Sequence, residues 1–155
     1  MKPASPANQL ADFIAKFTPA IAKLAKAVYA RLRKRLPCAV VMVYDNYQAL
    51  AIGFGARDRP SEAVLSVVVM PRKVAICFIW GKGLPDPHRL LRGSGNQVRS
   101  IRIEDAAELD DPRVAQLLDI AVARSATPFD TEGRGKLTIK SISAKQRPRR
   151  PKGNA

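Results

Sequence analysis

Arginine and glycine gather in one short stretch, where they could contact an anion. The set comprises His88, Arg89, Arg92, Gly93, Ser94, Gly95 and Arg99. Guanidinium groups donate paired hydrogen bonds to phosphate or carboxylate, and backbone N–H groups freed by glycine can do the same. The stretch therefore predicts a site for an anionic ligand. The alternative is that the glycines only turn the chain, while the arginines lie in water or pair with Asp86, Glu104 or Asp105.

Groups suited to catalysis or metal binding are few. His88 is the one histidine, and it could act as an acid or base, but its place just after Asp86 equally fits an exposed turn. Cys38 and Cys77 lie in apolar runs, where a thiol stays protonated and inert. The acids of residues 105–110 precede a predicted helix, whose N-terminus favours them. We predict no catalytic residue, no metal site and no cofactor.

Positive charge is concentrated at the two ends of the chain. Residues 1–35 hold 8 basic side chains and 1 acidic one, residues 133–155 hold 8 and none, and the whole chain has a net charge of +14. Basic ends can neutralise the phosphates of nucleic acid in a salt-dependent way. The candidate residues are Lys23, Lys26, Arg33, Lys34, Lys145, Arg147, Arg149 and Arg150. The alternative is a solvated helix face and tail that aid solubility.

Helices are predicted near both ends. Residues 7–35 form two helical pieces, and Thr18 followed by Pro19 starts the second. Its apolar stripe is Ile21, Leu24, Val28 and Leu32. A later helix opens at Asp111 and Pro112, and its apolar face is Val114, Leu117, Leu118, Ala121 and Val122. A single helical turn is expected over residues 88–92.

Between the helices lie runs rich in β-branched residues. Strands are predicted at 39–44, 48–55, 63–70, 74–80 and 97–103, and 137–142 is a candidate edge strand. Short connections favour antiparallel neighbours. The order predicts an α+β fold, an antiparallel sheet of about five to six strands with the N-terminal and C-terminal helices packed on one face.

The chain length fits one domain. We expect it to span residues 7–143, followed by a basic, disordered tail over 144–155. There is no apolar run of the roughly 18 residues that a membrane span needs, and the N-terminus lacks an apolar signal region. The expected location is therefore cytoplasmic, with no membrane partner. The sequence leaves the oligomeric state open.

Three stretches carry a resemblance to a known family. VYDNYQALAIGFG (43–55), GLPDPHRLLRGSG (83–95) and KSISAKQRPRRP (140–151) resemble the bacterial YdhG-like family, a domain of unknown function. The resemblance covers roughly residues 8–150 and implies a frataxin-like fold. It also implies iron handling, which in frataxin-like chaperones relies on an acidic ridge along the first helix. Residues 1–35 of this chain carry Asp12 as their one acid.

These observations lead to one first hypothesis and two alternatives. The first is a non-enzymatic binding or accessory domain that contacts an anionic ligand through the Arg/Gly-rich stretch. One alternative is a frataxin-like intracellular iron-binding chaperone, the only case in which iron is expected. The other is nonspecific binding of nucleic acid, a polyanion, through the basic helix and tail.

Overall fold

The computed structural model describes residues 4–130 and 132–151, and it has an α+β fold. Its helices are α1 (Pro6–Ala15), α2 (Pro19–Arg35) and α3 (Pro112–Ala123), with short 3-10 helices η1 (Pro60–Glu62) and η2 (Ala106–Asp110). Its strands are β1 (Val40–Asp45), β2 (Leu50–Gly55), β3 (Ala63–Met70), β4 (Lys73–Phe78), β5 (Arg99–Ile103) and β6 (Leu137–Ile142). Of the described helices, none is long and apolar enough to cross a membrane.

The six strands form one mixed sheet in the order β5-β4-β3-β2-β1-β6. Every pair is antiparallel except β1 and β6, which run parallel, with Val41 opposite Leu137. The prediction of a purely antiparallel sheet is therefore wrong at this edge. Tight turns force neighbouring strands to run antiparallel, but β6 returns through a long connection that contains α3, and such a connection permits parallel pairing.

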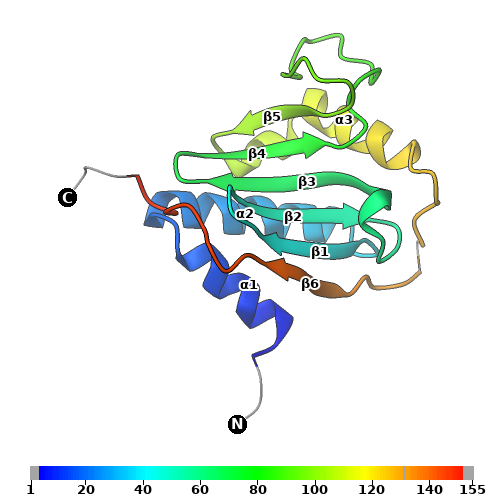
Figure 1. Cartoon of the computed structure of the whole chain (residues 1–155). Coiled ribbons are helices and arrows are strands. Elements are labelled where there is room, and N and C mark those ends of the chain that lie inside the picture. Colours follow the sequence, from blue (N-terminus) through cyan, green and yellow to red (C-terminus); the bar gives the residue numbers. More distant parts are fainter. Residues whose placement is uncertain (1–3, 131, 152–155) are drawn as a thin grey trace.

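Two helices cover one face of the sheet. Figure 1 shows α2 and α3 behind the strands, with α1 beside the β6 edge. Thr18 and Pro19 begin α2, as predicted, and Asp111 caps α3 by accepting the Arg113 N–H. The buried residues of α2 are Ala25, Val28 and Leu32, and those of α3 are Val114, Leu117, Leu118 and Ala121.

Side chains alternate across the central strands, so one face of the sheet is the core face. In β3, Leu65, Val67 and Val69 are fully buried against the helices, whereas Val68 and Met70 on the opposite face are half-buried. The inward positions of the neighbouring strands continue this core. The last inward position of β1 is different, because it is occupied by Asp45, whose carboxylate is fully buried.

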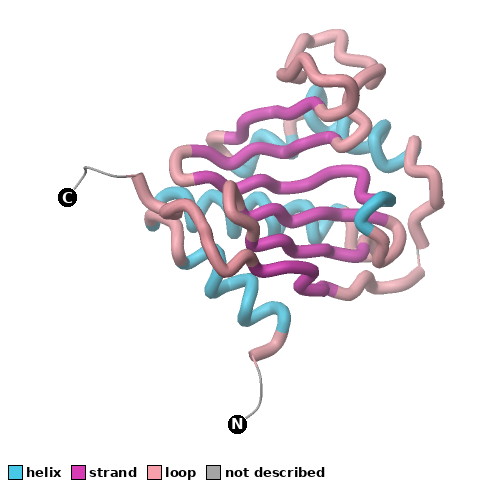
Figure 2. The backbone as a smooth tube through the Cα atoms, in the orientation of Figure 1, coloured by secondary structure: helices cyan, strands magenta, loops and turns pink. Residues whose placement is uncertain are grey.

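Residues 143–151, here called the C-terminal segment, continue from β6 along the β1–β2 turn (Figures 1 and 2). The Ser143 N–H donates to the Asp45 carbonyl at 2.9 Å, and the Arg147 N–H donates to the Tyr47 carbonyl at 2.9 Å. The predicted disordered tail thus differs from the structure over residues 144–151. The reason is that the Arg149 side chain of this segment binds the buried carboxylate of Asp45. Residues 152–155 lie outside the described residues.

Candidate anion-binding site

The β4–β5 loop, residues 79–98, carries the predicted Arg/Gly-rich site. The Asp86 carboxylate organises it by accepting the Leu90 N–H and the Leu91 N–H, each at 2.9 Å. The Arg89 N–H closes a turn onto the Asp86 carbonyl, and Arg89 has a φ of 54°. The predicted helical turn over 88–92 is therefore replaced by a tight turn. The Asp86 side chain takes N–H groups that a helix would bond to backbone carbonyls.

Replacing Asp86 with alanine tests this role. The N–H groups of Leu90 and Leu91 would lose their acceptors, so the free energy of unfolding should fall by about 1–2 kcal/mol, the usual cost of losing a side-chain cap. Urea unfolding measures the change. Asp130→Ala is a matched control, because the Asp130 carboxylate accepts the Glu132 N–H in an exposed turn. An Asp86→Ala protein as stable as the control would contradict the role.

Arg92 of the loop and Arg99, the first residue of β5, both donate to carbonyls of the loop. The Arg99 guanidinium donates to the carbonyls of Gly95 and Val98 at 2.7 and 2.8 Å, and Arg92 donates to the Arg89 carbonyl at 3.1 Å. Gly93 has a φ of +123°, and a Cβ there would lie 3.5 Å from the Arg99 side chain. The structure brings Arg99, Gly93 and Gly95 together, and one nitrogen of Arg99, Nη1, donates to both carbonyl oxygens.

The other predicted loop residues are exposed or line a different hollow. His88, Arg89 and Ser94 are exposed. Arg92 lines a separate hollow of about 290 Å³ between β5 and α3, where Arg102 and Arg113 contribute two more guanidinium groups. Glu108 and Asp111 line the same hollow, and hydrogen bonds from Arg113, helped by nearby charges, hold the pKa of Asp111 at about 2. The cations of this hollow therefore have carboxylate counterparts.

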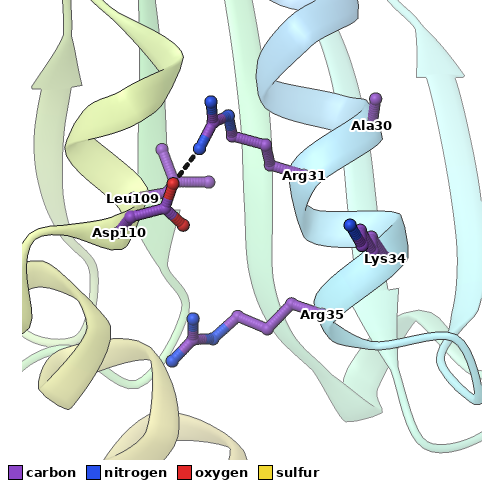
Figure 3. Close-up of a pocket in the computed structure, with 6 residues that line it drawn as sticks. All are labelled: Ala30, Arg31, Lys34, Arg35, Leu109 and Asp110. Atoms are coloured by element: carbon purple, nitrogen blue, oxygen red, sulfur yellow. Dashed lines mark hydrogen bonds and ion pairs between the residues drawn. The ribbon is translucent and has the colours of Figure 1, made fainter.

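The basic helix α2 borders a second hollow, of about 520 Å³ (Figure 3). Its lining consists of Ala30, Arg31, Lys34, Arg35, Leu109 and Asp110. Arg31 is ion-paired with Asp110, and Arg35 is paired with Asp119 at 2.9 Å. In Figure 3 the Lys34 side chain lies apart from the pair formed by Arg31 and Asp110. Most of the positive charge in this hollow is thus balanced by acids on η2 and α3.

The predicted nucleic-acid residues of α2 divide into two groups. Lys23, Lys26 and Lys34 are exposed. Arg33 instead donates to the carbonyls of Ala39 and Gly135, and so ties α2 to the start of β1 and to the chain before β6. Arg33 therefore acts in the fold, and the three lysines remain the open cations of this helix.

Asp45 is the structural centre that anchors the C-terminal segment. Its carboxylate accepts from the Lys16 ammonium at 2.8 Å and from the Arg149 guanidinium at 2.9 Å. Burial alone would raise the pKa of Asp45, but hydrogen bonds from the side chains of Lys16, Gln146 and Arg149 lower it below its usual value. The site therefore holds Asp45 as a charged carboxylate.

Arg149 is an anchor rather than an open cation. Only 6% of its surface is exposed, its guanidinium lies 5.7 Å from the centre of the Phe17 ring, and it donates to the Asn46 carbonyl at 2.6 Å. From the sequence we predict that Arg149 contacts nucleic acid, and we assign Asp45 no role. A signal for the pair does exist in the sequence, because Asp45 is in phase with the inward residues Val41 and Val43.

Anchoring of the C-terminal segment creates a third hollow, of about 480 Å³, here called the C-terminal pocket. Its lining consists of Gln48, Met70, Pro71, Arg72, Arg147, Pro148, Arg150 and Pro151. Arg147 donates to the Gln48 side chain at 3.0 Å, and Arg150 donates through Nε to the Lys16 carbonyl at 3.2 Å. All the lining residues belong to the described part of the chain, and none of them is acidic. Lys145 lies exposed nearby in sequence.

No protein-family model, curated protein or solved structure matches this chain. The resemblance to the YdhG-like family, and the frataxin-like arrangement that it implies, therefore remain predictions. Within residues 4–130 and 132–151, no three His, Cys, Asp or Glu side chains are grouped so that they could hold a metal ion. The iron alternative also remains a prediction.

Proposed function

We propose that this protein binds an anionic ligand, and that the C-terminal pocket is its main binding site. The observation that carries the proposal is the set of guanidinium groups of Arg72, Arg147 and Arg150, which line one hollow without a carboxylate among them. Arginine is suited to phosphate and carboxylate because its planar group donates several hydrogen bonds at once. A cluster of this kind attracts an anion and repels cations.

The bonding of the pocket arginines supports this choice over the hollow lined by Arg31 and Arg35. The Arg150 bond to Lys16 uses Nε, so its two terminal nitrogens are free of that contact, and Arg147 bonds only a neutral amide, that of Gln48. In contrast, Arg31 and Arg35 bind carboxylates. Guanidinium groups that already have acceptors gain less from a ligand.

A titration with tripolyphosphate tests the proposal. Binding is followed by calorimetry at near-physiological salt, so that weak polyelectrolyte attraction is screened. The double variant Arg72→Gln/Arg150→Gln should bind tripolyphosphate more weakly by a factor of about ten or more. Each charge-assisted hydrogen bond that it loses is worth about 1.5–3 kcal/mol. The matched control Lys23→Gln/Lys26→Gln removes the same charge from α2 and should bind as the parent protein does.

Two results would contradict the assignment. Equal weakening in both variants would mean that total charge, rather than the pocket, determines binding. The second result is unchanged binding in Arg72→Gln/Arg150→Gln together with weaker binding in an Arg89→Gln/Arg92→Gln variant. It would place the binding site in the β4–β5 loop, as the sequence predicts.

A further inference from the structure

The walls of the C-terminal pocket are of two kinds. The guanidinium groups supply its charge, whereas Met70, Pro71, Pro148 and Pro151 supply apolar surface. A small inorganic anion would use only the charged part. A hollow of about 480 Å³ is in the size range of sites for small organic ligands, which combine apolar walls with a few polar groups. The lining therefore fits a ligand that has both an anionic group and a flat, weakly polar body.

We propose that the ligand of the C-terminal pocket is a nucleoside phosphate unit, an inference that rests on the proposed function. Its phosphates would bind Arg72, Arg147 and Arg150. Its base would pack on Met70 and the prolines, whose rigid rings cost little entropy when a ligand covers them. The same unit occurs in a free nucleotide and in a single strand of nucleic acid, so the chemistry is shared by two sources.

Tyr47 distinguishes the two sources. Its side chain does not line the pocket, but the residue is 43% exposed and its carbonyl accepts the Arg147 N–H at 2.9 Å. The Tyr47 backbone therefore adjoins the pocket, and proteins use exposed aromatic rings next to a basic groove to stack the bases of single strands. A strand would reach Tyr47 with a second base, and a free nucleotide would leave that ring untouched.

The pocket exists because the C-terminal segment is anchored, and this makes a sharp test possible. Asp45→Asn removes one negative charge, so simple electrostatics would strengthen binding of an anion. It also removes the carboxylate that holds Arg149, and with it the position of Arg147 and Arg150. The two effects have opposite signs, and we expect the loss of the arginine positions to be the larger one. This variant should therefore bind nucleotide at least threefold more weakly, an energy change of about 0.7 kcal/mol or more.

The main experiment compares ATP with tripolyphosphate in the absence of divalent metal. The two share a triphosphate chain, and only ATP carries a nucleoside. The parent protein should bind ATP about fivefold or more tightly than tripolyphosphate, and Met70→Ala should abolish that preference while leaving tripolyphosphate binding unchanged. The matched control Val98→Ala shortens an exposed apolar side chain of the β4–β5 loop and should change neither affinity.

The outcomes separate the two proposals. If tripolyphosphate binds as tightly as ATP and Met70→Ala affects neither, the nucleoside inference is overturned while anion binding stands. If neither compound binds, or if Arg72→Gln/Arg150→Gln leaves binding intact, the proposed function itself fails. ATP binding that is weakened by Asp45→Asn and Met70→Ala supports both.

A further arm identifies the source of the nucleoside phosphate. A short oligothymidylate is compared with ATP on the parent protein and on Tyr47→Ala. If a strand is the ligand, the oligonucleotide binds more tightly than ATP and Tyr47→Ala weakens only the oligonucleotide, by about fivefold or more. If a free nucleotide is the ligand, ATP binds at least as tightly and Tyr47→Ala changes neither. Each result supports the nucleoside inference and assigns its source.

Discussion

Asp45→Asn is expected to lower the free energy of unfolding by about 3–5 kcal/mol, because it leaves the buried Arg149 guanidinium without its carboxylate partner. Both side chains are almost fully buried, at 0% and 4% exposure. Urea unfolding followed by circular dichroism measures the loss. Amide exchange should also become faster at Ser143 and Arg147, whose N–H groups hold the C-terminal segment on the β1–β2 turn.

The double variant Asp45→Asn/Arg149→Met separates loss of the ion pair from general damage. If the cost comes from a stranded buried charge, removing both partners should be less destabilising than the sum of the two single changes. Exactly additive losses, or a loss below about 1 kcal/mol for Asp45→Asn, would show that the pair does not anchor the segment.

The same pair predicts a dependence of stability on pH. Folding lowers the pKa of Asp45 below its ordinary value of 3.8, because hydrogen bonds from neighbouring side chains outweigh the effect of burial. The contribution of the Asp45 carboxylate to folding stability is therefore complete above the pKa that it has in the unfolded chain. This contribution is lost as the pH falls through the lower pKa that it has in the folded protein. The stability difference between the parent and Asp45→Asn should narrow below about pH 4. A difference that stays constant into acid would contradict this assignment.

Gly135→Ala is expected to destabilise the fold by about 2–3 kcal/mol, an overpacking cost at a backbone contact. A Cβ on Gly135 would overlap the carbonyl group of Ala39. The Gly135 N–H also donates to the Pro37 carbonyl at 3.1 Å, so the chain cannot move away without losing that bond. Urea unfolding gives the magnitude, and amide exchange in β6 shows where the damage lies.

Gly95→Ala serves as the control for this substitution. Nothing lies within 4 Å of a Cβ at Gly95, so its stability should stay within about 0.5 kcal/mol of the parent. A Gly135→Ala protein as stable as Gly95→Ala would show that residues 135–137 can shift from β1 without cost.

Periodicity made most of the fold predictable. The steps between Val28 and Leu32, and between Val114 and Leu118, place apolar side chains on one helix face wherever that helix packs. Thr18 and Asp111, each followed by proline, mark helix starts by local chemistry alone. The β-branched runs give the strands in the same way. These signals are local, and the structure confirms the α+β class that they predict.

The direction of β6 and the order in the C-terminal segment could not be predicted in this way. Both depend on contacts between residues far apart in the chain, such as Arg149 with Asp45 and Arg33 with Gly135. Composition made residues 144–155 resemble a disordered tail because proline and charge dominate there. Composition does not show that one of those charged residues, Arg149, forms a buried ion pair with Asp45 in β1.

The sequence predicts which residue types are clustered in the candidate sites, but it does not predict which acceptors their side chains bind. The sequence predicts clustered arginines in the β4–β5 loop, and Arg99 is indeed close to Gly93 and Gly95. The acceptors of Arg99, however, are the carbonyls of Gly95 and Val98 in the adjoining loop. Arg72 was missed because only the fold brings the β3–β4 turn beside Arg147 and Arg150. Whether an arginine is free to bind a ligand depends on its acceptors, which are set by the fold.

The parallel pairing of β6 with β1 has a consequence for how the chain is made. During synthesis β1 and β2 emerge before β6, the strand that pairs with the other side of β1, and the whole segment containing β3, β4, β5 and α3 is made in between. Until then β1 is an edge with unpaired N–H and C=O groups, and Asp45 lacks Arg149. Such an edge is a template for pairing with another chain. A polypeptide truncated before residue 137 would therefore be prone to aggregate, and β6 protects the β1 edge as well as completing the sheet.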